Sequence, residues 1–461
     1  MRRAERFGHW ICGALACLGC GRTTADAASS GDGPAAECGV ETDGCSGATL
    51  KGLHIAASAE VALRDVAVAG DGRVAIGGFY RGELDFGGDS VALPQTDNND
   101  GFIAVFDDQA RALWAKPFPG AGAQGITGVA FAGDGDLVAQ GFSDPRAAPL
   151  SSEPSGGAFA IRFDGHGDVT LRRGFAGDQT VAGKVAADSE QAQILVGNFT
   201  GQLDFSGLQA SLPPYVIRLK PDSSVDWIKQ LPVPGASAAV DGLVVKVDAK
   251  DAIVVSGDLL DDASSFLVKL QPPDDEPVYS QHFSGSGPVH AYAVAVDQQG
   301  AAVVAGAFTG ELDIGGESVA QTSMSSSDAW VAKFAEDGRL EWVKTYHGLD
   351  RRDGAKATAV AVDATGNVWF AGTAAAVYID DELVAPTGSS AEVAFVVKLR
   401  PNGDKLWVRF ADAELATFYG LDVGLSGTAW AGGAFSASLG LNGKQVLAEG
   451  TQDGFLLSLM P

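Results

Sequence analysis

Residues 293–346 read AVAVDQQGAAVVAGAFTGELDIGGESVAQTSMSSSDAWVAKFAEDGRLEWVKTY. Two apolar runs flank the turn VDQQG, the segment GELDIGG follows, and two more apolar runs flank the turn AEDG. Short runs of alternating or continuous apolar residues bounded by Gly, Asp and Asn are typical of β-strands joined by hairpins. This stretch therefore predicts one unit of four antiparallel strands.

The same unit recurs along the chain. A residue at the end of the second apolar run, usually glycine, marks the successive units at Gly77, Gln140, Gly197, Gly257, Gly306, Gly372 and Gly433. Self-similar units of short strands bury their faces against their neighbours, which is the organisation of a β-propeller. The sequence predicts an all-β fold, a seven-bladed β-propeller of four-stranded blades.

The two ends of the repeat region complement each other. Residues 453–459 match a third strand, so the last unit lacks its fourth, whereas residues 49–55 precede the first complete unit and have the length of a fourth strand. We expect the N-terminal and C-terminal strands to pair and close the ring, because closure leaves no unpaired sheet edge. The predicted domain is a propeller over residues 48–461.

The first residues carry an export signal. A basic start, MRRAER, precedes a mainly apolar stretch of twelve residues at 7–18, too short for a membrane-spanning helix. The sequence CLGC at 17–20 resembles the lipobox of bacterial lipoproteins, which implies lipidation of Cys20, with Cys17 as the alternative and an ordinary signal peptide also open. We expect a signal peptide at 1–19 and an N-terminal acyl anchor in the lipid bilayer of the bacterial cell envelope, at the outer membrane, on its periplasmic or outer surface.

Residues 20–47 are rich in Ala, Ser, Gly and Thr, a composition typical of a flexible tether. They contain Cys38 and Cys45, which in an oxidising compartment predict a small disulfide loop. A metal site using both cysteines with Glu41 and Asp43 is the alternative, although such a mixed set on a tether makes a poor cage.

The net charge and the pattern of chemically reactive residues limit the classes of function that the sequence allows. The chain has a net charge of −26, which repels phosphate backbones, so we expect no nucleic acid partner. The histidines show no metal-binding spacing and no Gly-x-Ser-x-Gly motif occurs, so we predict no metal, no cofactor and no catalytic residue. Arg351 and Arg352, in HGLDRRDGAK, form a candidate clamp for a carboxylate or phosphate; pairing with Asp350 and Asp353 on a solvated loop is the alternative.

Two further patterns recur. The segment GELDFGG at 82–88 and its relatives predict a structural turn that packs two apolar side chains between blades. Tryptophan recurs at one place in the fourth strand, followed two residues later by a basic residue. These positions are Trp114, Trp227, Trp342 and Trp407. Recurrence once per unit indicates packing of an outer strand on its neighbour rather than a sugar-stacking surface.

The turns VDQQG at 296–300 and VDATG at 362–366, GAFTGELDIGG from Gly306 and DAWVAKFAEDGRLEWVK from Asp328 resemble the bacterial seven-bladed β-propeller repeat family, exported lipoprotein type. Units two, four and six lack the LDFGG segment. The resemblance implies the fold but prescribes no catalytic residue.

The expected function is that of a membrane-anchored, non-enzymatic β-propeller lipoprotein, a monomeric scaffold that binds an envelope protein or glycan. The alternative is a periplasmic propeller enzyme: a lyase, a hydrolase or a quinoprotein-type dehydrogenase. Propellers host both roles. Convergence of His, Arg, Tyr and Asp at one mouth of the channel would favour the enzyme.

Overall fold

The structure is a computed structural model. It describes residues 49–87, 91–120, 122–143, 157–175, 179–200, 203–205, 208–210, 214–233, 240–272, 277–321, 326–348, 354–374, 377–379, 382–384, 393–411, 415–441 and 444–461. Every regular element in these ranges is a β-strand, which confirms the all-β class. No helix in the described ranges is long and apolar enough to cross a membrane.

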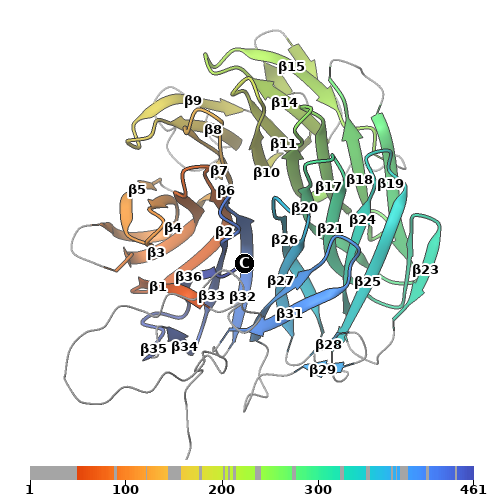
Figure 1. Cartoon of the computed structure of the whole chain (residues 1–461). Coiled ribbons are helices and arrows are strands. Elements are labelled where there is room, and N and C mark those ends of the chain that lie inside the picture. The colour runs from red at the N-terminus through yellow and green to blue at the C-terminus, as the bar shows by residue number, and fades with distance from the viewer. Residues whose placement is uncertain are drawn as a thin grey trace, which may run out of the picture.

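The strands form four-stranded antiparallel units arranged around one axis (Figure 1). The first three units comprise β2 (Glu60–Val68), β3 (Val74–Asp85), β4 (Ala92–Phe106) and β5 (Ala112–Phe118); β6 (Gln124–Phe131), β7 (Leu137–Ser143), β8 (Gly157–Phe163) and β9 (Val169–Phe175); and β10 (Gln179–Ala187), β11 (Gln193–Thr200), β14 (Tyr215–Leu219) and β15 (Val225–Gln230). The first strand of each unit lies next to the axis, and the fourth lies at the periphery.

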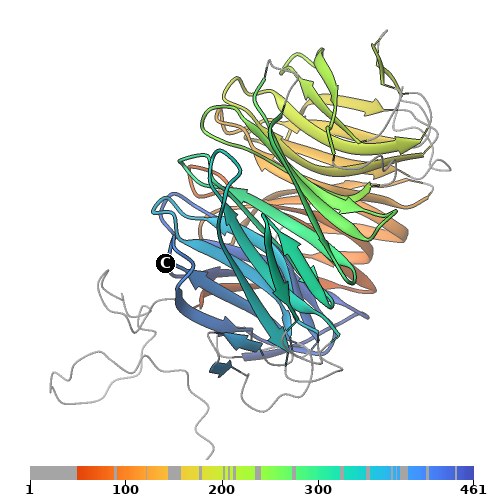
Figure 2. The same ribbon diagram turned by 90° about the vertical axis from the view of Figure 1, so that its right-hand side faces the viewer.

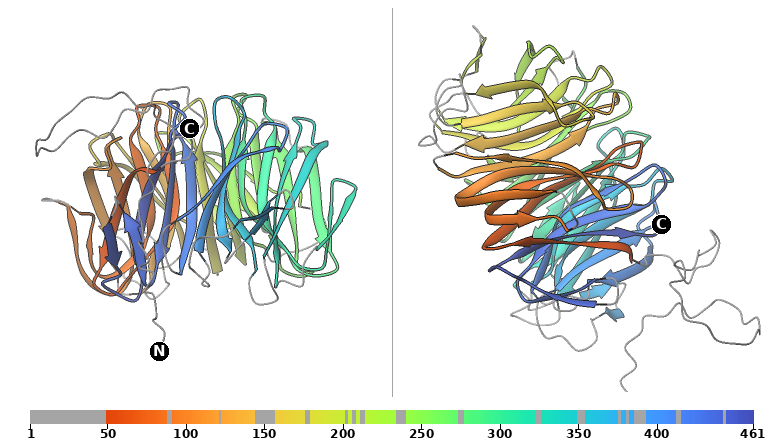
Figure 3. Two further views of the ribbon diagram at one scale, coloured as in Figure 1. Left: turned by 60° about the horizontal axis from the view of Figure 1, so that its bottom comes forward. Right: turned by 90° about the vertical axis from the view of Figure 1, so that its left-hand side faces the viewer.

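The remaining units repeat this order. They comprise β16 (Val240–Val247), β17 (Ile253–Leu259), β18 (Ser264–Leu270) and β19 (Pro277–Gly285); β20 (Val289–Val296), β21 (Ala302–Phe308), β24 (Asp328–Phe334) and β25 (Leu340–Gly348); β26 (Lys356–Val362), β27 (Val368–Ala374), β30 (Val393–Leu399) and β31 (Lys405–Phe410); and β32 (Ala416–Val423), β33 (Ala429–Phe435), β36 (Asp453–Leu459) and β1 (Thr49–Ala57). Seen from the side, the strands run between two opposite faces, where the turns lie (Figures 2 and 3).

The N-terminal and C-terminal strands pair with each other, as the sequence predicts for these two segments. The β1–β36 ladder is antiparallel and includes the pairs Thr49 with Leu459 and Ile55 with Gly454. The end of β1 also pairs with β3 through Ala56 and Ala57. The outermost strand of the last unit is therefore supplied by the beginning of the described chain.

Short hairpins join neighbouring units at the periphery. The GELDIGG segment forms β22 (Glu311–Ile314) and β23 (Glu317–Ala320), and β22 pairs with the outermost strand of the preceding unit, β19. Leu312 and Ile314 are buried there, and so are Leu84 and Phe86 of GELDFGG, which supports the prediction of a packing turn. Further hairpins are β12 (Leu203–Phe205) with β13 (Leu208–Ala210), β28 (Val377–Ile379) with β29 (Glu382–Val384), and β34 (Ser438–Leu441) with β35 (Lys444–Leu447). The sixth unit thus keeps a hairpin although its sequence has lost the motif.

Packing between neighbouring units buries the recurring tryptophans in part. Trp114 of the first unit lies 5.4 Å from Phe163 of the second, between ring centroids. Trp342 donates a hydrogen bond of 2.9 Å from Nε1 to the carbonyl oxygen of Pro401 in the next unit. Trp114 and Trp342 therefore pack the outer strand of one unit on the next unit, which supports the prediction from the sequence.

Buried ion pairs fix the turn between the first and second strands. Lys269 Nζ lies 2.9 Å from Asp248 Oδ2, and both side chains are almost fully buried. The same arrangement joins Lys333 to Asp297 at 3.0 Å, Lys398 to Asp363 at 3.3 Å and Arg218 to Asp188 at 2.7 Å. Each aspartate thus ties its turn to the third strand of its own unit.

A β-bulge interrupts the first strand of every unit at one place. The register shifts between Leu63 and Asp65, Ile126 and Gly128, Ala182 and Val185, Asp241 and Val244, Ala291 and Ala293, Ala357 and Ala359, and Phe418 and Gly420. A bulge leaves an extra residue outside the ladder, which re-aims its side chain. In every unit, the first strand therefore directs one side chain out of the sheet, at the same level along the axis.

A glycine of the second strand faces each bulge. These glycines are Gly78, Gly141, Gly197, Gly257, Gly306, Gly372 and Gly433. A β-carbon on Gly78, Gly306 or Gly372 would overlap a backbone carbonyl oxygen of the first strand. The repeat markers of the first two units, Gly77 and Gln140, are therefore each one residue too early, because the structural constraint falls on the next position.

Candidate functional site

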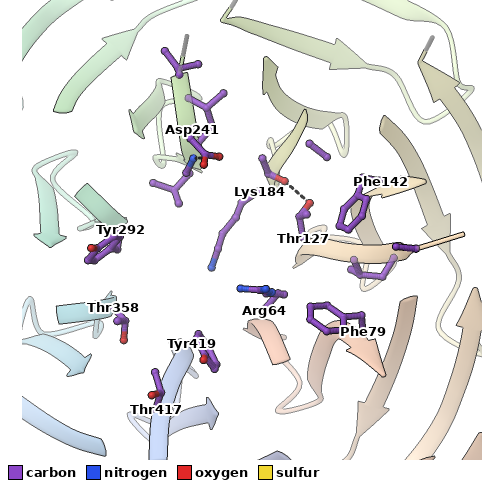
Figure 4. Close-up of a pocket in the computed structure, with 18 of the residues that line it drawn as sticks. Arg64, Phe79, Thr127, Phe142, Lys184, Asp241, Tyr292, Thr358, Thr417 and Tyr419 are labelled. Atoms are coloured by element: carbon purple, nitrogen blue, oxygen red, sulfur yellow. Dashed lines mark hydrogen bonds between the residues drawn. The ribbon is translucent and has the colours of Figure 1, made fainter. Parts of the chain in front are cut away.

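A cavity of about 990 Å³ lies on the axis, at the bulges (Figure 4). Every unit contributes its bulge residue to the wall. These residues are Arg64, Thr127, Lys184, Leu243, Tyr292, Thr358 and Tyr419. Because the first strands surround the axis and the bulge recurs in each unit, residues far apart in the described sequence line one site.

Two threonines of this set hold neighbouring units together. Thr127 Oγ1 donates a hydrogen bond of 2.6 Å to the carbonyl oxygen of Gly183, and Thr358 Oγ1 donates one of 2.6 Å to that of Phe418. In both cases the acceptor precedes the bulge residue of the next unit. The hydroxyl protons are thus used within the wall, and only the oxygen lone pairs remain to face a ligand.

Arg64 presents an exposed guanidinium group to the cavity. Its Cζ atom lies 5.2 Å from the ring centroid of Phe79 and 5.8 Å from that of Tyr419, which places the charge against two aromatic rings. Such cation–π contacts orient the group without neutralising it. The side chain is therefore held in place with its charge intact.

Lys184, on the first strand of the third unit, approaches the same point. Figure 4 shows its side chain and that of Arg64 pointing toward one another across the cavity. Lys184 Nζ lies 2.6 Å from Asp65 Oδ1, while Asp65 Oδ2 accepts a hydrogen bond of 3.0 Å from the backbone N–H of Val129. One carboxylate thus serves one lysine and one backbone donor and leaves the guanidinium group unneutralised.

The wall carries more positive than negative charge. Lys356 lines the cavity at the beginning of β26, and its side chain is exposed. Among the described residues, Asp241 is the one acidic residue that lines this cavity. Together with Arg64 and Lys184, this described part of the lining has three cations against one anion, although the whole chain has a net charge of −26.

A histidine–aspartate pair lies beside the cavity. His290 Nδ1 is 2.7 Å from Asp258 Oδ2, and the backbone N–H of Ala291 donates 2.9 Å to Asp258 Oδ1. The hydrogen bond that Asp258 accepts from the imidazole raises the pKa of His290, against burial and the charge of Lys356. The imidazole stacks on Tyr292, with ring centroids 5.4 Å apart, so the pair adjoins a residue of the wall.

Two further ionisable side chains near the axis, Tyr292 and Asp422, have shifted pKa values. Burial, and then the negative charge of Asp258, raises the pKa of Tyr292 to about 12, so its phenol stays protonated and can donate to a ligand. Burial also raises the pKa of Asp422 on β32, against the charge of Lys246 and a hydrogen bond of 2.8 Å from the Val68 N–H. Neither Asp422 nor Lys246 lines the cavity.

The sequence-predicted site residues fall elsewhere. Cys17, Cys20, Cys38, Cys45, Arg351 and Arg352 lie outside the described residues. Within the described ranges no group of three or more His, Cys, Asp or Glu side chains could hold a metal ion.

The cavity residues were missed, but a signal for them exists. In six units the bulge residue stands fourteen positions before the glycine that faces the bulge, as Tyr292 does before Gly306; Lys184 stands thirteen positions before Gly197. Aligning the units on that glycine would have collected Arg64, Tyr292 and Tyr419 as one set, with Lys184 one position away from it.

No family model matches the chain, and no curated protein matches it. Among solved structures, the polysaccharide lyase Uly1 is 10% identical with a TM-score of 0.45, covering 86% of this chain and 89% of the other. A putative 6-phosphogluconolactonase from Bacteroides uniformis is 11% identical with a TM-score of 0.40, covering 87% and 98%. A gluconolactonase from Xanthomonas campestris is 15% identical with a TM-score of 0.35, covering 72% and 85%. Such distant likenesses assign no function, so the site is interpreted from its own residues.

Proposed function

We propose that this protein is a seven-bladed β-propeller lipoprotein of the bacterial envelope that binds a glycan or a similarly polar small molecule in its channel. The four-stranded units and the β1–β36 ladder support a ring of seven blades closed by its two terminal strands. The lipobox-like sequence at 17–20 supports an acyl anchor at Cys20, with Cys17 as the alternative, at the outer membrane.

One observation carries the binding proposal: the bulge residues of all units line a single cavity of about 990 Å³. This volume is at the upper end of the range for small-molecule sites, roughly 300–1,000 Å³. The wall combines cationic groups, hydroxyl groups and tyrosine rings, which suit a polar ligand better than an apolar one. A glycan therefore fits this site better than the surface of a folded protein does.

A propeller enzyme is the second candidate, and a specific observation favours it. Arg64, Tyr292, Asp258 and His290 converge at or beside the cavity, which is the set expected of an enzyme. A carboxylate that orients a histidine is a common arrangement for general acid–base catalysis. A lyase or a hydrolase would use this pair to transfer a proton to or from its substrate.

One experiment separates the two candidates. The full-length protein in detergent is titrated with defined neutral and uronic-acid oligosaccharides, while thermal stabilisation and the composition of the oligosaccharides are followed. Binding with unchanged oligosaccharides supports the binding protein, and turnover that is lost in His290→Gln supports the enzyme. Tyr292→Ala should weaken binding, whereas Tyr378→Ala, outside the cavity, serves as the matched control. If no oligosaccharide stabilises the protein, the channel proposal is wrong.

A further inference from the structure

We infer that the ligand carries a carboxylate group, which Arg64 and Lys184 bind together at the centre of the cavity. The inference rests on the proposed function, because it specifies the ligand of the same channel. It identifies a hydroxylated carboxylic acid, such as a uronic acid residue of a glycan, as the class of ligand.

The first argument is that the guanidinium group of Arg64 has no anionic partner among the described residues. Among the residues that the structure describes, its guanidinium group has no hydrogen bond and no ion pair, and its contacts are with two aromatic rings. Four other arginines of this acidic chain are neutralised within the protein: Arg73 by Asp71, Arg111 by Asp107, Arg162 by Asp134 and Asp136, and Arg218 by Asp188. An arginine left unpaired where an acidic chain forms a cavity is available for an external anion.

The convergence of the two cations is the second argument. Arg64 comes from the first unit and Lys184 from the third, yet the two side chains point toward one another. Like charges that approach each other repel, and an anion placed between them relieves the repulsion. Asp65 offsets only one of the two charges, because its other oxygen is used by the Val129 N–H. The pair therefore has one positive charge in excess.

Geometry favours a carboxylate. A planar guanidinium group donates two parallel hydrogen bonds to the two oxygens of a carboxylate, and a lysine adds a third donor as a compact point charge. Tyr292, Thr373 and Thr417 add hydroxyl groups to the same wall, which can bond the hydroxyl groups of an attached sugar. The negative charge of the rest of the protein repels long polyanions and thus favours a short ligand.

The test uses three probes of nearly one shape: galacturonate, its methyl ester and galactose. Binding of each to the full-length protein is measured by calorimetry at constant ionic strength set with sodium chloride. We expect galacturonate to bind more tightly than the two neutral probes. Arg64→Gln and Lys184→Gln should each weaken galacturonate binding about tenfold or more, because each removes a charge-assisted hydrogen bond.

Two variants make the result specific. Arg64→Lys keeps the charge but loses the planar fork, so an intermediate loss is expected. Arg73→Gln is the matched control: Arg73 also lies over an aromatic ring, Phe131 at 5.3 Å, but pairs with Asp71 outside the cavity, and the variant should bind like the wild type. Melting temperatures without ligand verify that each variant is folded.

The outcomes distinguish this inference from the proposal on which it rests. Equal affinity for the acid, the ester and galactose would overturn the carboxylate inference and leave channel binding intact. Preference for sulfate or phosphate over galacturonate would also overturn it. Absence of binding by all probes would contradict both, whereas tight galacturonate binding that survives Arg64→Gln and Lys184→Gln would place the anion elsewhere.

Discussion

The α-carbon of Gly306 packs directly against the backbone carbonyl oxygen of His290, and no β-carbon fits between them. This contact lies across the bulge that turns Tyr292 into the cavity. Gly372 has the same relationship to Lys356, beside the bulge at Thr358. The glycines that face the bulges at Arg64, Thr127 and Tyr419 also lie too close to a backbone carbonyl oxygen for a β-carbon. A backbone requirement for glycine in the second strand thus accompanies most of the side chains that the first strands direct into the cavity.

Replacing Gly306 by alanine should therefore affect both stability and the site. The new β-carbon would overlap the carbonyl oxygen of His290, and relief requires a shift of the first strand. We expect a loss of about 2 kcal/mol or more in the free energy of unfolding, measured in urea, and weaker ligand binding. Gly70→Ala is the control, because its β-carbon would make only an ordinary contact with Leu425. Equal stability of both variants would show that the bulge tolerates a side chain.

Ionisation of Asp363 should make the free energy of unfolding depend on pH in the acid range. Burial opposes its ionisation, but hydrogen bonds from Thr365, Trp369 and Asn367 outweigh burial and lower the pKa of Asp363 from 3.8 to about 2. A lowered folded-state pKa stabilises the protein above the unfolded value, near pH 4, and this contribution is lost as the pH falls toward 2.

The shift corresponds to about 2 kcal/mol at neutral pH. Asp363→Asn should lose at least this amount at pH 7, since Lys398 also loses its partner. The difference from the wild type should shrink as the pH approaches 2, as measured by chemical denaturation along a pH series. Asp108→Asn, at an exposed turn, should show little change; a pH-independent gap for Asp363→Asn would contradict the assignment.

The threonine contacts between units should contribute separately to stability. Thr358→Val removes the hydrogen bond to the carbonyl oxygen of Phe418 and leaves that acceptor unpaired, at an expected cost of about 1 kcal/mol. Thr127→Val should cost a similar amount through Gly183. Thr358→Ser keeps the hydroxyl group and should recover most of the loss in urea denaturation. A serine variant as unstable as the valine variant would assign the effect to the methyl group.

The His290–Asp258 pair should titrate together. The raised pKa of His290 means that the pair stabilises the protein fully below pH 6.5, and the contribution is lost as the pH rises through the raised value. In Asp258→Asn the pKa of His290 should fall toward or below 6.5. The NMR signal of the His290 ring, recorded along a pH series, measures this change. Asp313→Asn, an exposed position, is the control. If the pKa of His290 is the same in Asp258→Asn as in the wild type, Asp258 is not the cause of the raised pKa.

The anchor has its own test. In Cys20→Ser, incorporation of labelled palmitate and recovery in the membrane fraction should both be lost. Cys17→Ser is the matched variant and should retain both. The reverse pattern would move the anchor to Cys17, and labelling of neither cysteine in the wild type would leave an ordinary signal peptide.

Repetition made the fold predictable from sequence. The turn at Asp297, the packing turn at Leu312 and the pairing of the strand at Thr49 with that at Leu459 all follow from patterns that recur or complement each other. The bulge leaves no comparable trace, because one extra residue in an apolar strand does not alter its composition. For this reason the glycine next to Gly77 could not be recognised as the constrained one.

The site could not be predicted for a related reason. Arg64 and Lys184 are single basic residues in separate apolar strands, and no local motif marks either of them as part of a site. Attention to local charge led instead to Arg351 and Arg352, which lie outside the described residues. Only the register of the first strands shows that residues 120 positions apart meet.

The β1–β36 ladder also sets the order in which this molecule can be completed. His54 is paired with Phe455, so the two partners are synthesised about as far apart in time as the chain allows. Contacts of such long sequence separation form late, since closing a long loop costs entropy. Until Asp453–Leu459 has emerged, most of β1 has no partner, and a chain that stops earlier exposes two sheet edges. We therefore expect chains that end before this strand to be degraded faster than chains that contain it.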